Sequence, residues 1–218
     1  MKVLVLGANG ATGVLAVKHL LQRGHEVTAF TRRRAQMGEA KTVLGNVLDS
    51  ASVERAVQGQ DAVVVTLGIR ENPLAVRLRG SRNTAMDVRS RGTQHAVDAM
   101  KKLGVRRLVV QTTYGVAETW PRLSWMWKAI FALILKPQIR DTELQEDVVR
   151  RSGLEWTLAR PVGLTDSLAD QQLSASPNGE VEGMQVSRDS VARFLADAVE
   201  DARYARQAVS LSSRPRLD

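Results

Sequence analysis

The chain of 218 residues contains no cysteine, so it can form neither a disulfide bond nor a thiolate metal site. We expect no metal centre, and a chain without cysteine fits a reducing compartment such as the cytoplasm. No apolar run approaches the roughly 20 residues needed to cross a bilayer, so the sequence predicts no transmembrane segment. A predicted strand follows Met1 directly, and we therefore expect no targeting peptide.

Acidic residues are also scarce, since 23 Asp and Glu stand against 31 Lys and Arg and leave a formal net charge of +8. The basic clusters at 32–34 and along 77–91 are not interleaved with aromatic residues, as a platform for single-stranded nucleic acid requires. We therefore do not expect a nucleic-acid partner. An anionic cofactor, used with a small-molecule substrate, accounts better for the excess of cations.

What the sequence does contain is a regular alternation of apolar strands and amphipathic helices. Such strands, spaced by such helices, indicate a parallel sheet covered on both faces. The predicted strands span residues 2–7, 25–30, 41–45, 61–68, 106–113, 154–161 and 207–213. The predicted helices span residues 11–23, 50–59, 89–104, 139–153 and 187–201. We predict one doubly wound α/β domain over residues 1–218, with a small substrate lobe from about 113–138 and 162–186.

The stretch "GANGATG" lies between the first predicted strand and the first predicted helix. Gly7 allows a tight turn, Gly10 lets the backbone approach a pyrophosphate, and Gly13 lets the helix pack closely on the sheet. The amino terminus of the helix then offers unpaired N–H groups to phosphates. We expect the cofactor to contact this loop at Gly7, Asn9, Gly10, Ala11, Thr12 and Gly13.

The end of the second predicted strand has no acidic residue. An acid at this point would accept hydrogen bonds from a ribose 2′-hydroxyl and select NAD. The chain instead reads "FTRRR", which places Arg32 and Arg33 there. A guanidinium fork suits a 2′-phosphate, so the sequence favours NADP(H).

The G-x-x-G-x-x-G spacing, together with "LGNVLDSASVERAVQGQDAVVVTLGIR" and "SGLEWTLARP", resembles the atypical short-chain dehydrogenase/reductase superfamily. The resemblance runs from Met1 to about Pro161 and is strongest toward the biliverdin reductase B (flavin reductase-like) and NmrA-like groups. It implies a Rossmann-like fold. It also implies that Asn46 and Val47 flank the adenine, although the family more often has Asp at position 46. Further contacts with the cofactor are implied at Leu67, Gly68, Thr112 and Pro161.

The stretch "QTTYGVAETW" lacks the Lys that usually follows a catalytic Tyr by four residues, because position 118 is Glu. The resemblance places the hydroxyls of Thr113 and Tyr114 nearest the reacting centre. An unassisted Tyr114 can still donate a proton in a reduction, or it can be a buried aromatic beside the cofactor. We expect Glu118 to be a solvated loop residue, with a general-acid role as the alternative. A missing Tyr–Lys pair favours conjugated acceptors, on which the incoming charge is delocalised.

Three tryptophans follow at positions 120, 125 and 127, and the segment 125–135 is apolar on nearly every face. We expect Trp120, Trp125 and Val162 to line the substrate pocket, where a flat conjugated molecule would stack. For the apolar segment three roles remain open. It can be a pocket wall or lid, a homodimer interface, or a membrane-surface contact.

The sequence therefore predicts an NADPH-dependent oxidoreductase. Its hydride acceptor would be a flavin, a quinone, a tetrapyrrole or a related carbonyl compound. The alternative is an NADP(H)-sensing regulator of the NmrA-like type that has lost its catalytic groups. A sugar-nucleotide epimerase or dehydratase would need the Tyr–Lys pair and a larger C-terminal lobe, so we favour it least.

Overall fold

The computed structural model describes residues 1–69, 71, 80–81, 84–130, 133, 136–166 and 172–214, and its centre is one eight-stranded sheet. The strand order is β3-β2-β1-β4-β5-β6-β10-β8, and every pairing is parallel except that of β10 with β8. The strands are β1 (Lys2–Leu6), β2 (Glu26–Thr31), β3 (Lys41–Leu44), β4 (Ala62–Val65), β5 (Arg107–Gln111), β6 (Glu155–Pro161), β8 (Leu173–Ser176) and β10 (Gln207–Ser213).

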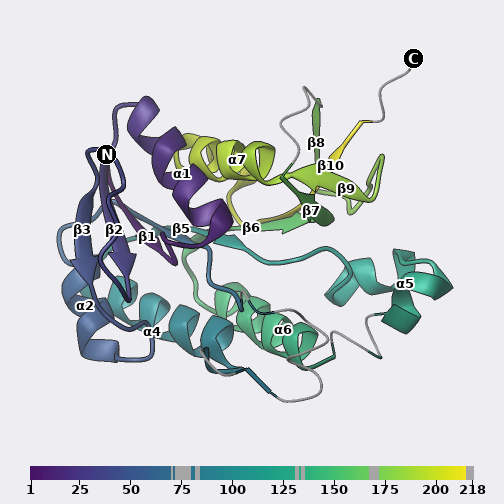
Figure 1. Cartoon of the computed structure of the whole chain (residues 1–218), viewed down its shortest axis with the longest axis horizontal. Coiled ribbons are helices and arrows are strands. Elements are labelled where there is room, and N and C mark those ends of the chain that lie inside the picture. Colours follow the sequence, from purple (N-terminus) through teal and green to yellow (C-terminus); the bar gives the residue numbers. More distant parts are fainter. Residues whose placement is uncertain are drawn as a thin grey trace.

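Helices cover both faces of this sheet, as Figure 1 shows. Helices α1 (Ala11–Gln22) and α7 (Arg188–Glu200) pack together on one face. Helices α2 (Ser50–Val57), α4 (Val88–Leu103) and α6 (Lys136–Arg150) lie side by side on the other. The central strands β1 and β4 are apolar and largely buried, and every residue of β4 is buried. The prediction of a doubly wound, Rossmann-like α/β fold is confirmed.

The ends of several helices follow from single residues. Asp49 caps α2 by accepting a hydrogen bond from the N–H of Ala51, and Ser187 caps α7 through the N–H of Ser190. Helix α4 ends at Gly104, whose φ of 75° is a left-handed conformation that costs glycine little. These helix boundaries are the ones that the sequence predicts, to within a few residues.

The region predicted as a substrate lobe adds short elements beyond the carboxyl ends of β5 and β6. A 3-10 helix, η1 (Ala117–Arg122), and the helix α5 (Trp125–Ile130) follow β5. Strands β7 (Gly163–Thr165) and β9 (Gln185–Ser187) pair as a separate two-stranded sheet. The stretch 162–186 is thus not purely a lobe, because its strand β8 joins the main sheet. Residues 131–132, 134–135 and 167–171 of the predicted lobe lie outside the described residues.

None of the helices in the described ranges combines the length and the apolar character of a membrane-spanning helix. A second 3-10 helix, η3 (Ala202–Tyr204), connects α7 to β10.

Candidate functional site

The glycine loop forms a tight turn between β1 and α1. Gly7 has a φ of 84°, and a Cβ there would lie 2.8 Å from the carbonyl oxygen of Thr66. The Gly10 N–H donates to the Gly7 carbonyl at 2.8 Å, which closes the turn. A Cβ on Gly13 would collide with the Gly7 carbonyl, so Gly13 serves the packing of α1 on the sheet. Gly7 and Gly13 therefore have the backbone roles that the sequence indicates, and the approach of a pyrophosphate at Gly10 stays a prediction.

The amino terminus of α1 is open to a ligand. Gly10 is its N-cap, no side chain caps it, and its first turn holds no acid. The Thr66 hydroxyl is 3.2 Å from the carbonyl oxygens of both Leu6 and Gly7, so it fixes the end of β4 to the loop. The unpaired N–H groups and the positive end of the helix dipole would stabilise a pyrophosphate at this position.

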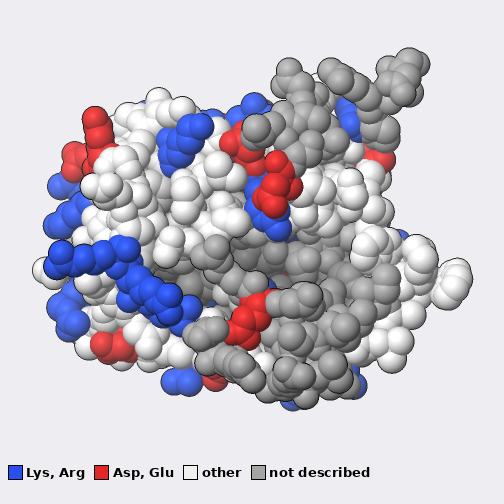
Figure 2. All heavy atoms as spheres, viewed as in Figure 1, with Lys and Arg blue, Asp and Glu red and all other residues white. Residues whose placement is uncertain are grey.

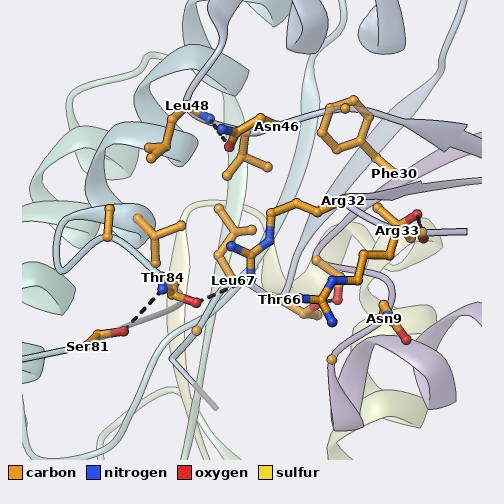
Figure 3. Close-up of a pocket in the computed structure, with 18 of the residues that line it drawn as sticks. Asn9, Phe30, Arg32, Arg33, Asn46, Leu48, Thr66, Leu67, Ser81 and Thr84 are labelled. Atoms are coloured by element: carbon orange, nitrogen blue, oxygen red, sulfur yellow. Dashed lines mark hydrogen bonds between the residues drawn. The ribbon is translucent and has the colours of Figure 1, made fainter. Parts of the chain in front are cut away.

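A cavity of about 650 Å³ extends from this loop across the carboxyl ends of β1, β2 and β4 (Figure 3). Nine of the predicted cofactor residues line it, whereas Gly13 lies behind it. They are Gly7, Asn9, Gly10, Arg32, Arg33, Asn46, Val47, Leu67 and Gly68. The lining also includes Phe30, Leu48 and Thr84, which sequence reasoning did not select.

Two guanidinium groups stand at the end of β2. The Arg32 guanidinium reaches the segment that precedes α4 and donates a hydrogen bond of 3.2 Å from Nη2 to the Thr84 hydroxyl. The Thr31 hydroxyl donates to the Arg33 carbonyl at 2.7 Å, which fixes the turn that presents both arginines. Lys and Arg side chains gather on the same side of the molecule in Figure 2. This end of the cavity can hold a phosphate and offers no carboxylate from β2 to bind a ribose diol.

Asn46 and Val47 form the wall opposite the glycine loop. Asn46 Oδ1 accepts the N–H of Leu48 at 3.1 Å, which shapes the turn after β3. The Val47 carbonyl lies 2.9 Å from His95 Nδ1, so that nitrogen carries the proton in this contact. His95 therefore has a structural role, since it holds the Val47 carbonyl to α4.

A second cavity, of about 580 Å³, adjoins the first and shares Gly10, Thr66, Leu67, Gly68 and Glu71 with it. It lies over the carboxyl ends of β4, β5 and β6, where ligands of open α/β sheets bind. Besides the shared residues, seven further predicted site residues line it, namely Ala11, Thr12, Thr112, Thr113, Tyr114, Pro161 and Val162. The two cavities together form one cleft, which brings the predicted cofactor residues and the predicted hydroxyls next to each other.

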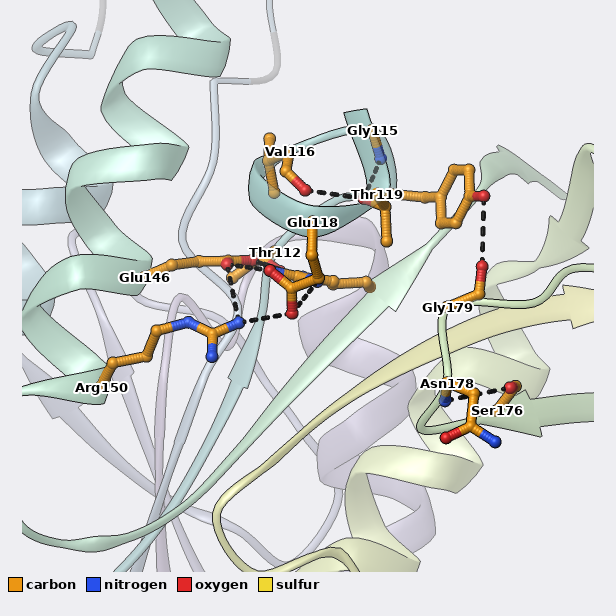
Figure 4. Close-up of polar contacts among 12 residues, drawn as sticks. Thr112, Gly115, Val116, Glu118, Thr119, Glu146, Arg150, Ser176, Asn178 and Gly179 are labelled. Carbon is orange, nitrogen blue, oxygen red and sulfur yellow. Dashed lines mark hydrogen bonds and ion pairs between the residues drawn. The ribbon is translucent and has the colours of Figure 1, made fainter. Parts of the chain in front are cut away.

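The two threonines after β5 have different surroundings. Thr112 is buried, and its hydroxyl donates to Glu146 of α6 at 2.8 Å (Figure 4). Its side chain is therefore committed to the helix rather than to a cofactor. The Thr113 hydroxyl makes a longer contact, 3.3 Å to the Tyr114 carbonyl, and remains half-buried at the cleft.

Tyr114 is only 4% exposed, and its hydroxyl donates to the carbonyl of Gly179 at 3.3 Å. Burial raises the pKa of the phenol, and the charge of Arg122 opposes this only in part. A neutral phenol bonded to the loop between β8 and β9 holds the small lobe in place. The structure thus favours the alternative of a buried structural aromatic over a catalytic Tyr114.

Glu118 is exposed, as the sequence predicts, but it lies in the 3-10 helix η1 and its carboxylate is ion-paired. Its carboxylate lies 2.9 Å from Arg160 Nη1 and 2.8 Å from Arg150 Nη2. Arg160 is 1% exposed and is also paired with the buried Glu146. Partial burial would raise the pKa of Glu118, but the hydrogen bond and charge of Arg160, with the charge of Arg150, lower it to about 2. A general-acid role near neutral pH is therefore excluded.

Neither of the two tryptophans predicted for the substrate pocket, Trp120 and Trp125, lines either cavity. Trp125 is 82% exposed, and Trp120 is exposed as well. Trp127 instead contributes to the second cavity, together with Leu123 and Met184. Tryptophan spacing alone gave no indication of which ring turns inward, because the short helix α5 departs from the line of the sheet.

Arg89 is a cleft residue that sequence reasoning missed. It lies in the first turn of α4, lines the second cavity, and has its Nη2 3.4 Å from where a Cβ on Gly68 would be. Its Nη1 is buried and has no hydrogen-bond partner within the described part of the chain. Burial lowers the pKa of this guanidinium, and Asp141 opposes the shift. A buried cation with an unused donor fits an anionic group of a ligand.

A glycine-rich turn at the amino end of α1, below a cleft at the carboxyl ends of a doubly wound sheet, defines a dinucleotide-binding protein. The chain belongs to the NAD(P)H-binding family, whose model matches residues 7–202. An uncharacterized chloroplastic protein of Arabidopsis thaliana is 28% identical over 209 residues, which are 91% of this chain and 71% of that protein. The Bacillus subtilis protein named an uncharacterized sugar epimerase is 26% identical over 220 residues, 97% of this chain and 94% of that protein.

Solved structures have the same fold. The anaerobillin reductase ChuY of Escherichia coli O157:H7 superposes with a TM-score of 0.79 at 24% identity, and the match covers 100% of this chain and 99% of that one. A Veillonella parvula short-chain dehydrogenase/reductase in complex with NADP superposes with a TM-score of 0.78 at 18% identity, covering 99% of each chain. These structures confirm the predicted Rossmann-like fold, and the family model confirms the predicted NAD(P)H-binding family.

Proposed function

We propose that this protein is an NADPH-dependent reductase whose hydride acceptor is a conjugated molecule such as a flavin, a quinone or a tetrapyrrole. The observation that carries the proposal is the composite cleft. One end presents Arg32 and Arg33 beside an open helix terminus, and the other end has the half-buried hydroxyl of Thr113.

The preference for NADP(H) over NAD(H) rests on charge. Arg32 and Arg33 supply fork-shaped donors where a 2′-phosphate would lie, and the end of β2 has no carboxylate that would repel it. Asn9 and the N–H groups after Gly10 would bind the pyrophosphate. Gly68 and Pro161 would flank the nicotinamide, which supplies hydride when the cofactor is bound.

The acceptor class follows from what the second cavity lacks. Tyr114 has no Lys partner four residues on and gives its proton to Gly179, so it does not assist a developing alkoxide. A conjugated acceptor spreads the incoming charge and can take its proton from solvent. Reduction of such an acceptor depends chiefly on its alignment and stacking in the cavity. The side chains of Trp127, Leu123 and Met184 can provide both. The reductase named among the similar structures acts on anaerobillin, which agrees with this class.

NADPH oxidation, followed by its absorbance with menadione or FMN as acceptor, tests the proposal. We expect turnover with at least one of these acceptors, and a lower KM for NADPH than for NADH. Micromolar binding of NADPH without turnover of menadione, FMN or biliverdin would contradict a reductase.

That negative outcome would favour the second candidate, an NADP(H)-sensing regulator, which the structural use of the Tyr114 hydroxyl also allows. One relative is named a sugar epimerase. The absent Tyr–Lys pair argues against that chemistry for this chain, because removing a proton from a sugar hydroxyl requires an activated Tyr.

A further inference from the structure

The segment 119–140 differs from the rest of the chain in its charge. Its 22 residues include three Trp and four cations, Arg122, Lys128, Lys136 and Arg140, and no Asp or Glu. The whole chain has 23 acids in 218 residues. At an ordinary acid content, a stretch of 22 residues would contain about two acids. Cations and apolar side chains are therefore concentrated together in one part of the surface.

The structure exposes this segment. Trp125 is 82% exposed, and Met126 and Leu133 are also largely exposed. Helix α5 lies apart from the packed layers, beyond the carboxyl end of the sheet, and α6 begins on the same side (Figure 1). The face seen in Figure 2 carries no acidic side chain on the projecting end around α5. We call the exposed residues of the segment 119–140 the α5 surface.

Of the two acids that bracket the α5 surface, Asp141 is buried, and Glu118 is exposed but held in ion pairs. Glu118 is ion-paired with Arg150 and Arg160. Asp141 is buried and accepts hydrogen bonds from the backbone and the hydroxyl of Ser90 on α4. Both carboxylates thus have partners outside the segment, and Arg122, Lys136 and Arg140 are exposed together with Trp125.

This charge pattern selects the occupant. A second copy docked here about a two-fold axis would bring Lys128, Lys136 and Arg140 against the same cations, which is repulsive. An anionic bilayer complements them instead. Tryptophan prefers the depth of the lipid headgroups, and each Lys or Arg near an anionic leaflet adds electrostatic attraction.

We propose that the α5 surface docks the protein on the surface of an anionic lipid bilayer, with Trp125 and Met126 inserted at headgroup depth. The same segment turns Leu123 and Trp127 into the substrate cavity. Docking therefore places the mouth of the cleft at the membrane, where a lipid-soluble quinone could enter it. Only this last step, the supply of acceptor, rests on the proposed reductase function.

Co-sedimentation with vesicles tests the docking directly. We expect the protein to bind phosphatidylcholine vesicles that contain phosphatidylglycerol at least about tenfold more tightly than pure phosphatidylcholine vesicles. Trp125→Ala with Met126→Ala should weaken binding about tenfold. The control is Leu44→Ala, which removes an exposed apolar side chain on β3. Lys136→Glu with Arg140→Glu should abolish the preference for anionic vesicles, whereas Lys101→Glu on α4 should not.

Each variant must keep the NADPH affinity of the parent protein, which shows that the fold is intact. Absent vesicle binding, or equal binding to neutral and anionic vesicles, would overturn the proposal. So would size-exclusion chromatography that shows a dimer converted to a monomer by the Trp125→Ala and Met126→Ala pair. Vesicle binding without NADPH oxidation would refute the reductase and leave the docking intact, so the two failures can be told apart.

Discussion

The hydroxyl of Thr112 donates a hydrogen bond of 2.8 Å to Glu146 on α6, while the next side chain, Thr113, lies at the cleft. Two adjacent hydroxyls thus serve different ends. One anchors the end of β5 to a helix, and the other is available to a ligand.

Thr113→Val should therefore lower kcat, by about tenfold, because a donor near the reacting centre is lost while the charge on a conjugated acceptor is already delocalised. The matched change Thr112→Val should leave kcat within about twofold. It should instead lower the free energy of unfolding by about 1 kcal/mol, measured in urea. An equal loss of kcat in both variants would contradict this division of roles.

Arg32→Glu should raise the Kd for NADPH about 100-fold, because it removes charge-assisted hydrogen bonds and adds a repelling carboxylate. The Kd for NADH should change little. Isothermal titration calorimetry with both nucleotides gives the two values. Arg34→Glu is the control, since Arg34 is an exposed neighbour outside the cavity lining. A preference for NADPH that survives Arg32→Glu would refute the assignment of this guanidinium.

Tyr114→Phe should preserve kcat within about twofold and lower the free energy of unfolding by about 1 kcal/mol, because only the hydrogen bond to Gly179 is lost. Steady-state kinetics and urea unfolding of the same preparation provide both readouts. If kcat instead falls by 100-fold or more, as roughly expected for loss of a general acid, Tyr114 donates to the substrate and moves away from Gly179 during turnover.

Glu118 makes stability depend on pH in the acid range. Its pKa in the folded protein is lowered from 4.5 to about 2, so the unfolded state binds the proton more readily. The stabilisation is complete above pH 4.5 and is lost as the pH falls toward 2. Glu118→Gln should flatten this part of the curve and cost about 1 kcal/mol at neutral pH, a value reduced for the exposure of the carboxylate.

Chemical unfolding at several pH values measures this effect. The comparison is Glu155→Gln, which breaks the ion pair with Arg106, in which both side chains are exposed. If both variants show the same acid dependence, the network around Arg160 has no special role in it.

Arg89→Met should raise the KM of a carboxylate-bearing acceptor about tenfold and leave that of menadione unchanged, because the unused Nη1 donor would no longer bind the anion. The free energy of unfolding should not fall, since a desolvated cation is replaced by an apolar chain. Arg91→Met on the same helix is the control, as that exposed guanidinium pairs with Asp87. A loss of stability in Arg89→Met would indicate a structural role.

The fold could be predicted from the sequence because its signals are local. The apolar run of β4 and the glycines around α1 each specify a conformation within a few residues. Strand β8, Leu173–Ser176, escaped prediction because it is a polar, half-buried edge strand whose conformation depends on pairing with β10.

The lining of the first cavity was predictable for the same reason, since the glycine loop and Arg32 lie at fixed places directly after β1 and β2. The substrate end was not. Whether Thr112 or Thr113 faces the cleft depends on Glu146, which is 34 residues away in sequence. Whether Trp125 or Trp127 turns inward depends on how α5 leaves the sheet, and no periodic pattern encodes that direction.

The guanidinium of Arg160 ties β6 to two carboxylates from different segments, Glu146 on α6 and Glu118 on η1. Removing Arg160 or Glu146 leaves an uncompensated charge at a buried position, whereas Glu118 is partly exposed. Replacement of the two buried residues is therefore best tolerated when both become uncharged together. Because Glu146 also accepts the hydroxyl of Thr112, this ion-pair network fixes which of the two adjacent threonines presents its hydroxyl to the cleft.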